Sequence, residues 1–263
     1  MPNIIQGNTI LNPYHSDSKS NLKKFDYIVS NPPFKLDFSD YRDELDSKQN
    51  QDRFFAGIPS IPPKDKKKMA IYLLFIQHTI KSISDKGKAA IVVPTGFLTA
   101  TSIAKKIREH LVNNKMLSGV ISMPTNIFAD TGTNVSIIFF DNNTNDEVVL
   151  INASNLGKVV KIGKSQKTLL STEDENLIVD TFKKRKKIDN FSVKVSFKDI
   201  VKRRFSFSAG QYFDIKVEYK DISEKDYNTN IKVFTEELKN FKADSEKYEK
   251  EILAQIKKLQ YEN

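Results

Sequence analysis

The sequence predicts an α/β fold, followed by a basic segment and a long C-terminal helix. Three observations predict this arrangement. Short apolar runs alternate along the first half of the chain with segments of helical period. Positive charge is concentrated in the segment that follows. Apolar residues near the C-terminus then recur at alternating steps of three and four, which is typical of a long helix with a heptad repeat.

The first elements are a strand, a loop and a helix. Residues 25–30 form a short apolar run that Asn-Pro-Pro halts, which predicts a buried strand entering a rigid turn. Residues 35–66 are polar and carry prolines without a clear period, so we expect a long functional loop. Residues 68–84 are apolar on most sides and predict a largely buried helix, which the turn at 85–87 ends.

The alternation of strand and helix then repeats. Residues 88–94 are an unbroken apolar run, as expected of a strand in a sheet that is covered on both faces. A stripe of apolar side chains at helical spacing predicts a helix over 102–114. Residues 119–124 are expected to form the next strand.

Two further strands are expected at 135–140 and 148–151. The polar run 141–146 between them looks like a hairpin turn, so the two strands should be antiparallel neighbours. A helix is expected near 172–184, because acidic residues lie at its start and basic residues at its end, as the helix dipole favours.

The C-terminal segment carries the heptad seam. Seven of its nine seam positions are apolar, and a seam of this kind requires a partner helix. The alternative is a helix that packs back on its own domain. The seam positions are Ile231, Phe234, Leu238, Phe241, Ser245, Tyr248, Ile252, Gln255 and Leu259.

The net charge of +9 is unevenly distributed. Residues 1–155 carry a net +3, residues 156–220 a net +8 and residues 221–263 a net −2. We therefore predict a first domain over 1–155, a basic connecting segment over 156–227 and a C-terminal helix over 228–263. The basic segment is either a solvated surface or a patch that faces a polyanion, and charge alone does not separate the two.

Composition excludes several classes of site. Zero cysteines exclude disulfides, thiolate zinc sites and a cysteine nucleophile, and three scattered histidines predict no metal centre. No two of the nine glycines lie closer than six residues, so we expect no glycine-rich nucleotide loop, and residues 157–165 are interpreted as a basic turn. No apolar run approaches the ~20 residues of a membrane span and no secretory signal is visible, so we expect a cytoplasmic protein.

One short motif carries chemistry, since Asn31, Pro32, Pro33 and Phe34 directly follow the first strand. Ligands of an open α/β sheet bind at the carboxyl ends of strands. The prolines remove two amide donors and leave carbonyl acceptors, the Asn amide adds an acceptor, and Phe adds a flat apolar face. This set suits a planar ring that bears an amino group. The alternative is a turn whose phenylalanine belongs to the core.

At this motif the sequence resembles a known family. Residues 25–34 look like the catalytic motif of DNA adenine-N6 methyltransferases, and the downstream pattern resembles the modification subunit of type I restriction-modification systems. The resemblance runs in order from about residue 5 to residue 155 and is weaker at 207–212. Its further blocks are Arg53-Phe54, Gly57–Pro59, Pro62–Lys64, Phe75–His78, Gly87–Pro94, Ile107-Arg108, Gly119–Phe128 and Thr131–Ser136.

The resemblance implies a mechanism in which the target adenine is flipped out of the duplex. It implies that the Asn31 side-chain oxygen and the Pro32 backbone oxygen accept hydrogen bonds from the adenine amino group, while Phe34 stacks on the base. Asn31, Pro32, Pro33 and Phe34 are thus the expected catalytic residues. The implied methyl donor is S-adenosylmethionine. No strong general base is required, because the proton leaves after the nitrogen has become cationic, so catalysis rests on positioning and electrostatics.

Family members usually place cofactor-binding strands and a glycine-rich turn before the catalytic motif, and we find neither in this sequence. The resemblance therefore implies a partial Rossmann-like methyltransferase sheet with the C-terminal strands only. Residues 4–11 resemble the segment before the catalytic strand, where Asn8 replaces the acid that contacts the cofactor adenine. We expect the chain to be inactive alone and to need a complementary N-terminal methylase fragment.

Two functions stay open. In the first, the chain is part of a site-specific DNA adenine-N6 methyltransferase that is active only when completed. In the second, it is a non-catalytic assembly module that is associated with DNA and binds a specificity subunit through its C-terminal helix. A small-molecule or RNA methyltransferase shares the Asn-Pro-Pro motif but gains little support, since the later blocks match the type I pattern. DNA contacts are predicted at Lys184, Arg185, Lys186, Arg203 and Arg204.

Overall fold

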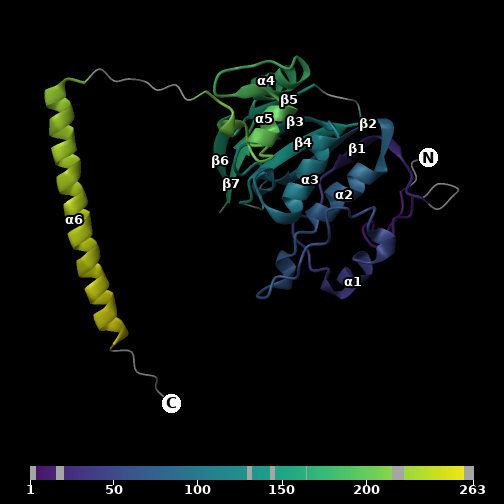
Figure 1. Ribbon diagram of the computed structural model, residues 1–263, viewed down its shortest axis with the longest axis horizontal. Coiled ribbons are helices and arrows are strands. Elements are labelled where there is room, and N and C mark those ends of the chain that lie inside the picture. The colour runs from purple at the N-terminus through teal and green to yellow at the C-terminus, as the bar shows by residue number, and fades with distance from the viewer. Residues whose placement is uncertain are drawn as a thin grey trace. The chain divides into compact units, whose positions relative to one another are not determined.

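The computed structural model describes residues 4–15, 21–128, 132–142, 146–163, 165–214 and 222–257 (Figure 1). The chain divides after Asp214 into two compact units, and each is described by itself. The first holds the sheet and its helices, and the second holds one long helix. The predicted domain limits at residues 155 and 227 stay a prediction.

A six-stranded sheet forms the centre of the first unit, and the α/β fold class is confirmed. Its strand order is β1-β2-β4-β3-β5-β8. Strands β1, β2, β3 and β5 run in one direction, and β4 and β8 run in the other. The strands are β1 (Phe25–Ser30), β2 (Ile83–Pro94), β3 (Leu117–Ser122), β4 (Val135–Asp141), β5 (Glu147–Asn152) and β8 (Ser192–Ser196).

The predicted antiparallel pair of neighbouring strands at 135–140 and 148–151 is wrong. Strand β4 lies between β2 and β3 and is antiparallel to both, whereas β5 pairs in parallel with β3. Ile138 of β4, which is fully buried, pairs with Ile91 on one side and Val120 on the other. Apolar strands of this kind fit any interior position, so their pattern did not select a neighbour. Part of the predicted turn, 143–145, lies outside the described residues.

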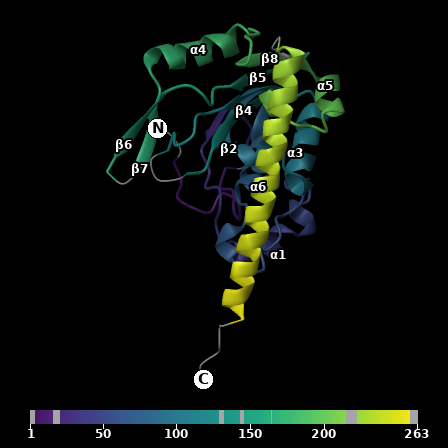
Figure 2. The ribbon, with the colours of Figure 1, turned by 90° about the vertical axis from the view of Figure 1, so that its left-hand side faces the viewer.

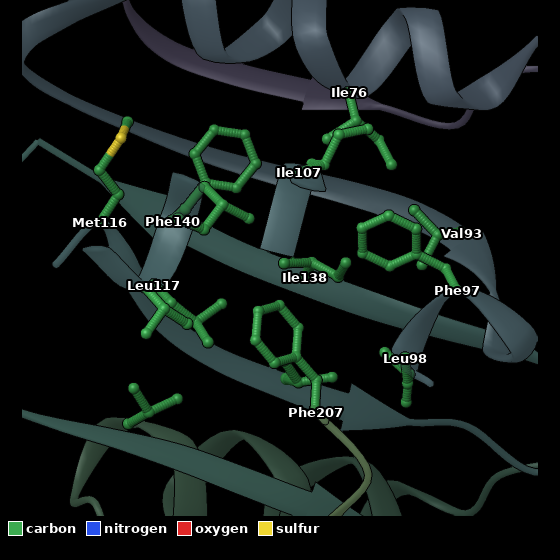
Figure 3. Close-up of a cluster of buried hydrophobic side chains, with 14 of the residues drawn as sticks. Ile76, Val93, Phe97, Leu98, Ile107, Met116, Leu117, Ile138, Phe140 and Phe207 are labelled. Carbon is green, nitrogen blue, oxygen red and sulfur yellow. The ribbon is translucent and has the colours of Figure 1, made fainter. Parts of the chain in front are cut away.

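Helices cover the two faces of the sheet unequally. On one face, α2 (Tyr72–Ser82), α3 (Ser102–Asn113) and α5 (Phe197–Lys202) enclose the main core, part of which Figure 3 shows. On the other face, α4 (Thr172–Lys183) packs over β3, β4 and β5. A side chain at Gly119 of β3 would bring a Cβ to 2.6 Å from the Phe182 ring, so glycine allows α4 to pack this closely.

The boundaries of α2 and β2 differ from the predicted 68–84 and 88–94. Helix α2 begins only at Tyr72, because Met69 is extended and its carbonyl accepts a hydrogen bond from the Leu36 amide at 3.2 Å. Strand β2 begins at Ile83, but its register with β1 jumps across residues 84–87. The predicted turn at 85–87 therefore lies inside an irregularity of the strand.

The predicted long loop 35–66 packs as a small second core. Its apolar side chains bury Ile10 and the start of α2, although their irregular spacing gives no helical or strand period. The core residues are Ile10, Phe38, Leu45, Phe54, Ile58, Met69, Ile71 and Leu74. The short helices around it are η1 (Ser39–Tyr41), α1 (Arg42–Leu45), η2 (Lys48–Asn50) and η3 (Lys66–Lys68), and two further ones are η4 (Thr95–Leu98) and η5 (Ala209–Gln211).

The basic segment is more regular than its sequence suggested. Residues 157–165, interpreted as a basic turn, include β6 (Lys158–Ile162), which pairs antiparallel with β7 (Ser165–Leu169). Strand β8 and helix α5 were also not predicted. The predicted helix 172–184 is confirmed as α4, and the Ser171 hydroxyl accepts a hydrogen bond from the Asp174 amide at its start.

The second unit contains α6 (Glu224–Ile256), a helix of 33 residues with no buried side chain within that unit. The Ser223 hydroxyl caps it by accepting a hydrogen bond from the Asp226 amide at 3.1 Å. Its predicted seam residues are exposed, including Leu238 and Phe241, each 69% exposed. The last one, Leu259, lies outside the described residues. In the described part of the chain, no helix is long and apolar enough to cross a membrane.

Candidate functional site

The carboxyl ends of four strands meet at one edge of the sheet, which we call the carboxyl edge. Because β1, β2, β3 and β5 point the same way, the residues that follow them lie along this edge. These residues are Asn31, Thr95, Met123 and Ala153. Edges of this kind bind the ligands of open α/β sheets.

The turn from Asn31 to Phe34 follows β1 at the carboxyl edge. Asn31 and Pro33 are exposed, Pro32 is buried, and Phe34 is half-buried. Among the described residues, neither the Asn31 side chain nor the Pro32 carbonyl has a hydrogen-bond partner. The turn therefore offers two unpaired acceptors beside an aromatic ring.

Phe34 is held by a row of aromatic rings. It packs edge-to-face on Tyr72 of α2, with 6.5 Å between ring centroids and an interplanar angle of 79°. Tyr72 packs in the same way on Phe97, at 6.2 Å. Burial raises the pKa of the Tyr72 hydroxyl, so it stays neutral at ordinary pH. Phe97 is fully buried, which fixes the far end of the row.

Arg108 fixes the segments around Phe97. The side chain is only 1% exposed, and its guanidinium donates hydrogen bonds to three backbone carbonyls, those of Phe97, Ala100 and Phe205. Two of these carbonyls belong to the turn after β2, and the third precedes Phe207, whose amide bonds to the Leu98 carbonyl. Arg108 thereby connects α3 with both segments that pack behind the aromatic row.

The turn after β2 is tied to the start of β4. The Thr95 amide donates to the Asn134 carbonyl at 2.8 Å, and the Thr95 hydroxyl lies 3.0 Å from that of Ser136. Ser30 pairs with Ile91, so β2 extends past the Asn31 turn at this edge. The turn after β2 is thus held in place beside the two unpaired acceptors of the Asn31 turn.

Asn8, the predicted cofactor contact, lies on an exposed turn. Its Oδ1 accepts hydrogen bonds from the Ile10 and Leu11 amides, each at 3.1 Å. Its oxygen is therefore used locally, and the Nδ2 amide is the group left to donate to a ligand. This one donor does not by itself fit a whole S-adenosylmethionine molecule.

Arg53 anchors the Asn8 turn to α2. It is 6% exposed, and it donates to the carbonyls of Thr9 and Ile10, both at 2.7 Å, and to His78 Nδ1 at 3.2 Å. Because Nδ1 accepts this bond, His78 is neutral. Burial first, and the Arg53 charge second, lower the pKa of His78 to about 4.

The predicted DNA contacts come from two segments: Lys184, Arg185 and Lys186 follow α4, whereas Arg203 and Arg204 precede Phe205, whose carbonyl accepts a hydrogen bond from Arg108. The Arg185 guanidinium donates to the Glu147 carbonyl at the start of β5, which is the edge opposite the carboxyl edge. Lys184 forms an ion pair with Asp180 at 2.7 Å. Arg203 lies over the Tyr212 ring, 5.8 Å from its centroid. DNA binding by Lys184, Arg185, Lys186, Arg203 and Arg204 stays a prediction.

Two parts of the carboxyl edge were missed by the sequence analysis. Tyr72 sits in a helix that is apolar on most sides, so its hydroxyl-bearing ring was not distinguished from core residues. Residues 157–165, interpreted as a basic turn, belong to the β6–β7 hairpin, in which lysines recur at every third position from 158 to 167.

Known proteins give the context for this arrangement. The sequence profile described as N-6 DNA methylase matches residues 2–221. The chain is 29% identical over 217 residues to the type I restriction enzyme MpnII methylase subunit of Mycoplasma pneumoniae, covering 80% of this chain and 38% of that one. It is 28% identical over 254 residues to the MjaIX methylase subunit of Methanocaldococcus jannaschii, covering 91% and 43%.

Solved structures share the fold. The type I restriction-modification methyltransferase subunit of Streptococcus thermophilus aligns with a TM-score of 0.63 and 24% identity, covering 79% of this chain and 41% of that one. A chain from a study of the assembly of the type I restriction-modification system aligns with a TM-score of 0.56 and 19% identity, covering 95% and 50%. The chain thus spans about two fifths of the length of the curated relatives above. Since the profile matches most of its residues, this chain belongs to the N-6 DNA methylase family.

Proposed function

We propose that this chain carries the target-base half of a site-specific DNA adenine-N6 methyltransferase of the type I restriction-modification kind. The observation that carries the proposal is the turn after β1, where the Asn31 amide and the Pro32 carbonyl lie unpaired beside Phe34 at the carboxyl edge. The family membership and the type I relatives support adenine in DNA as the substrate.

The proposed reaction moves a methyl group from S-adenosylmethionine to the adenine amino nitrogen. The adenine is flipped from the duplex and stacks on Phe34. Asn31 Oδ1 and the Pro32 carbonyl accept hydrogen bonds that the two amino hydrogens donate, which localises the nitrogen lone pair for attack. The methyl donor, held by the complementary part, would supply the methyl group: its carbon–sulfur bond would break as the nitrogen–carbon bond forms, and the proton would then leave the cationic nitrogen for solvent. Fixed acceptors at this point supply catalysis by positioning and electrostatics.

The outer face and edge of β1 support the need for a complementary part. Among the described strands, β1 pairs with β2 alone. Tyr27 and Val29 are 80% and 87% exposed on the face that α2 and α3 do not cover. Unpaired strand edges and exposed apolar faces favour association with another chain or domain. We propose that the cofactor-binding part of the family, in a longer chain or as a separate one, continues the sheet beside β1.

Substitution of Asn31 tests the proposed role. In the completed enzyme, Asn31→Ala should lower the rate of methyl transfer to DNA at least about 100-fold, the scale of losing one preorganised hydrogen-bonding group. Binding of the complementary part should be unchanged. Asn113→Ala, at an exposed position near the opposite edge, is the matched control. Equal methylation by Asn31→Ala and unmodified enzyme would overturn the assignment.

The exposed seam of α6 favours a second candidate function, an assembly module that binds a specificity subunit. Under this alternative the chain docks its partner but transfers no methyl group. Leu238→Asp with Ile252→Asp should abolish co-purification with a specificity subunit, because both side chains are exposed apolar seam positions. Ala243→Asp with Lys250→Asp, on the opposite side of the helix, is the control. Methyl transfer by a completed complex, lost in Asn31→Ala, excludes the purely structural role.

A further inference from the structure

The β6–β7 hairpin is a basic ribbon that projects from the sheet, as Figure 2 shows. Lysines occur at every third position, 158, 161, 164 and 167, and no acidic residue lies between Gly157 and Leu170. Lys158 and Lys161 are exposed, and Lys167 is half-buried. The structure gives none of these three an ion pair within its described ranges. Their charges are therefore available to a polyanion.

Thr168 fixes the base of the hairpin to the carboxyl edge. It is 3% exposed, its amide donates to the Asn126 carbonyl at 2.9 Å, and its hydroxyl donates to the Thr125 carbonyl at 2.6 Å. Gly157 has a φ of +83°, and a Cβ there would lie 2.7 Å from Thr168 Cγ2. The hairpin is thus attached to the turn that follows β3.

This attachment places the lysines on the same edge as the Asn31 turn. Strands β1 and β3 are three places apart in the sheet, which is about 15 Å at the usual strand spacing. Successive phosphates of one DNA strand advance about 3.4 Å along the helix axis, so this offset corresponds to about four nucleotides of a duplex that lies along the edge. A duplex whose target base enters the Asn31 turn would have its flanking phosphates at the hairpin.

We propose that the β6–β7 hairpin binds the phosphate backbone of duplex DNA beside the flipped base. The inference rests on the proposed function, because that function brings DNA to the carboxyl edge. Lysine ammonium groups bind phosphates as point charges and confer no base specificity. The hairpin therefore holds the duplex in register with the target-base turn, and sequence choice lies elsewhere.

Exposed apolar side chains on the hairpin suggest one alternative, that the hairpin binds a protein partner. Val159 is 54% exposed and Leu169 is 46% exposed. These two side chains lie on opposite faces of the ribbon, since Val159 pairs with Thr168 and Leu169 with Lys158. They do not form one apolar patch, whereas the described lysines occur on both faces of the ribbon, Lys158 and Lys167 on one and Lys161 on the other. The charge distribution therefore favours the polyanion.

The salt dependence of DNA binding tests the proposal. A labelled duplex is titrated with the full chain between about 50 and 200 mM salt, and the slope of log affinity against log salt is measured. The variant Lys158→Gln, Lys161→Gln, Lys167→Gln should bind at least about tenfold more weakly, with a slope reduced by up to about 2.7, since each lost phosphate contact contributes about 0.9. The control Lys86→Gln, Lys106→Gln, Lys198→Gln removes three exposed lysines from other surfaces and should change neither value.

Cross-linking locates the contact independently. The chain has no cysteine, so Lys161→Cys and Lys198→Cys each accept a single photo-crosslinker. Lys161→Cys should cross-link to duplex DNA, and Lys198→Cys should not.

An unchanged salt slope in the triple variant overturns the hairpin contact while leaving methyl transfer by the completed enzyme intact. Cross-links from Lys161→Cys to a protein subunit instead of DNA would also overturn it. Failure of the completed enzyme to methylate any DNA would instead refute the proposed function.

Discussion

The two ends of the sheet differ in how completely they are covered. At the β5 end, helices pack on both faces, and Val149 is 0% exposed between α4 and the neighbouring strands. At the β1 end, helices cover one face, and Val29 on the other is 87% exposed. The turn from Asn31 to Phe34, the proposed target-base site, follows the uncovered strand. The difference in cover is the basis for the proposal that the complementary part docks beside β1.

The largest expected effect tests whether the open end is a docking surface. Val29→Asp should weaken association with the complementary part at least about 100-fold, because a carboxylate would be buried there without a partner. The chain's own stability should change by less than about 0.5 kcal/mol, as for other exposed sites. Association is measured by titration calorimetry and stability by urea unfolding. Lys106→Asp is the surface control, and undiminished association of Val29→Asp would show that β1 is not the interface.

Stability should also depend on pH, because Arg53 and the neutral His78 tie the Asn8 turn to α2. His78 has a pKa of about 4 in the folded chain against 6.5 when unfolded, so the unfolded state binds the proton more readily between these values. The stability is fully present above pH 6.5 and falls as the pH drops to about 4, by up to about 3 kcal/mol.

Urea unfolding between pH 7 and about pH 4 measures this loss. His78→Gln keeps an acceptor for Arg53 but does not titrate, so most of the pH dependence should disappear. A smaller pH dependence of stability should persist in His78→Gln, because burial, and then the Lys81 charge, also lower the pKa of His110. An identical pH dependence in His78→Gln and the unmodified chain would contradict the assignment.

A matched pair of substitutions compares the two ends directly. Val149→Ala should reduce the free energy of unfolding by about 2 kcal/mol, from lost burial and a residual cavity. Val29→Ala should cost less than about 0.5 kcal/mol. Urea unfolding of both variants measures the difference. Equal costs would mean that the face of β1 is covered within this chain.

The smallest predicted effect concerns the hairpin anchor. Thr168→Val keeps the shape of the side chain but removes the hydroxyl that donates to the Thr125 carbonyl, which should cost about 1 kcal/mol. Hydrogen exchange of the β6–β7 amides should speed up more than that of β5. Thr229→Val, at an exposed α6 position, provides the reference. Unchanged exchange in the hairpin would show that the bond does not anchor it.

The sequence was informative where local patterns decide structure. The strand at 25–30 and the helix at 172–184 follow from short-range signals. The predicted burial of that strand is wrong, because β1 lies at the edge of the sheet and leaves Tyr27 and Val29 80% and 87% exposed. The order of β4 and β5 was wrong, because both strands are apolar and their neighbours are chosen by tertiary packing. The loop 35–66 shows no helical or strand period in its sequence, because its buried residues Phe38, Leu45 and Phe54 are irregularly spaced.

The candidate site was predictable only in part, because tertiary packing decides which residues support it. The four residues of the turn were identified from their chemistry and their family resemblance. The support behind them was not, because Tyr72, Phe97 and Arg108 come from three separate elements that only the fold brings together. Their sequence neighbours give no indication of these contacts.

Methyl transfer by the chain with and without its complement tests the central claim most directly. Labelled S-adenosylmethionine and adenine-containing duplex DNA are incubated with the purified chain, with the N-terminal part of a full-length family member, and with both. We predict incorporation into adenine N6 with both parts together, none above background with either alone, and loss of the combined activity in Asn31→Ala. Turnover by the isolated chain, or a combined activity that survives Asn31→Ala, would contradict the account.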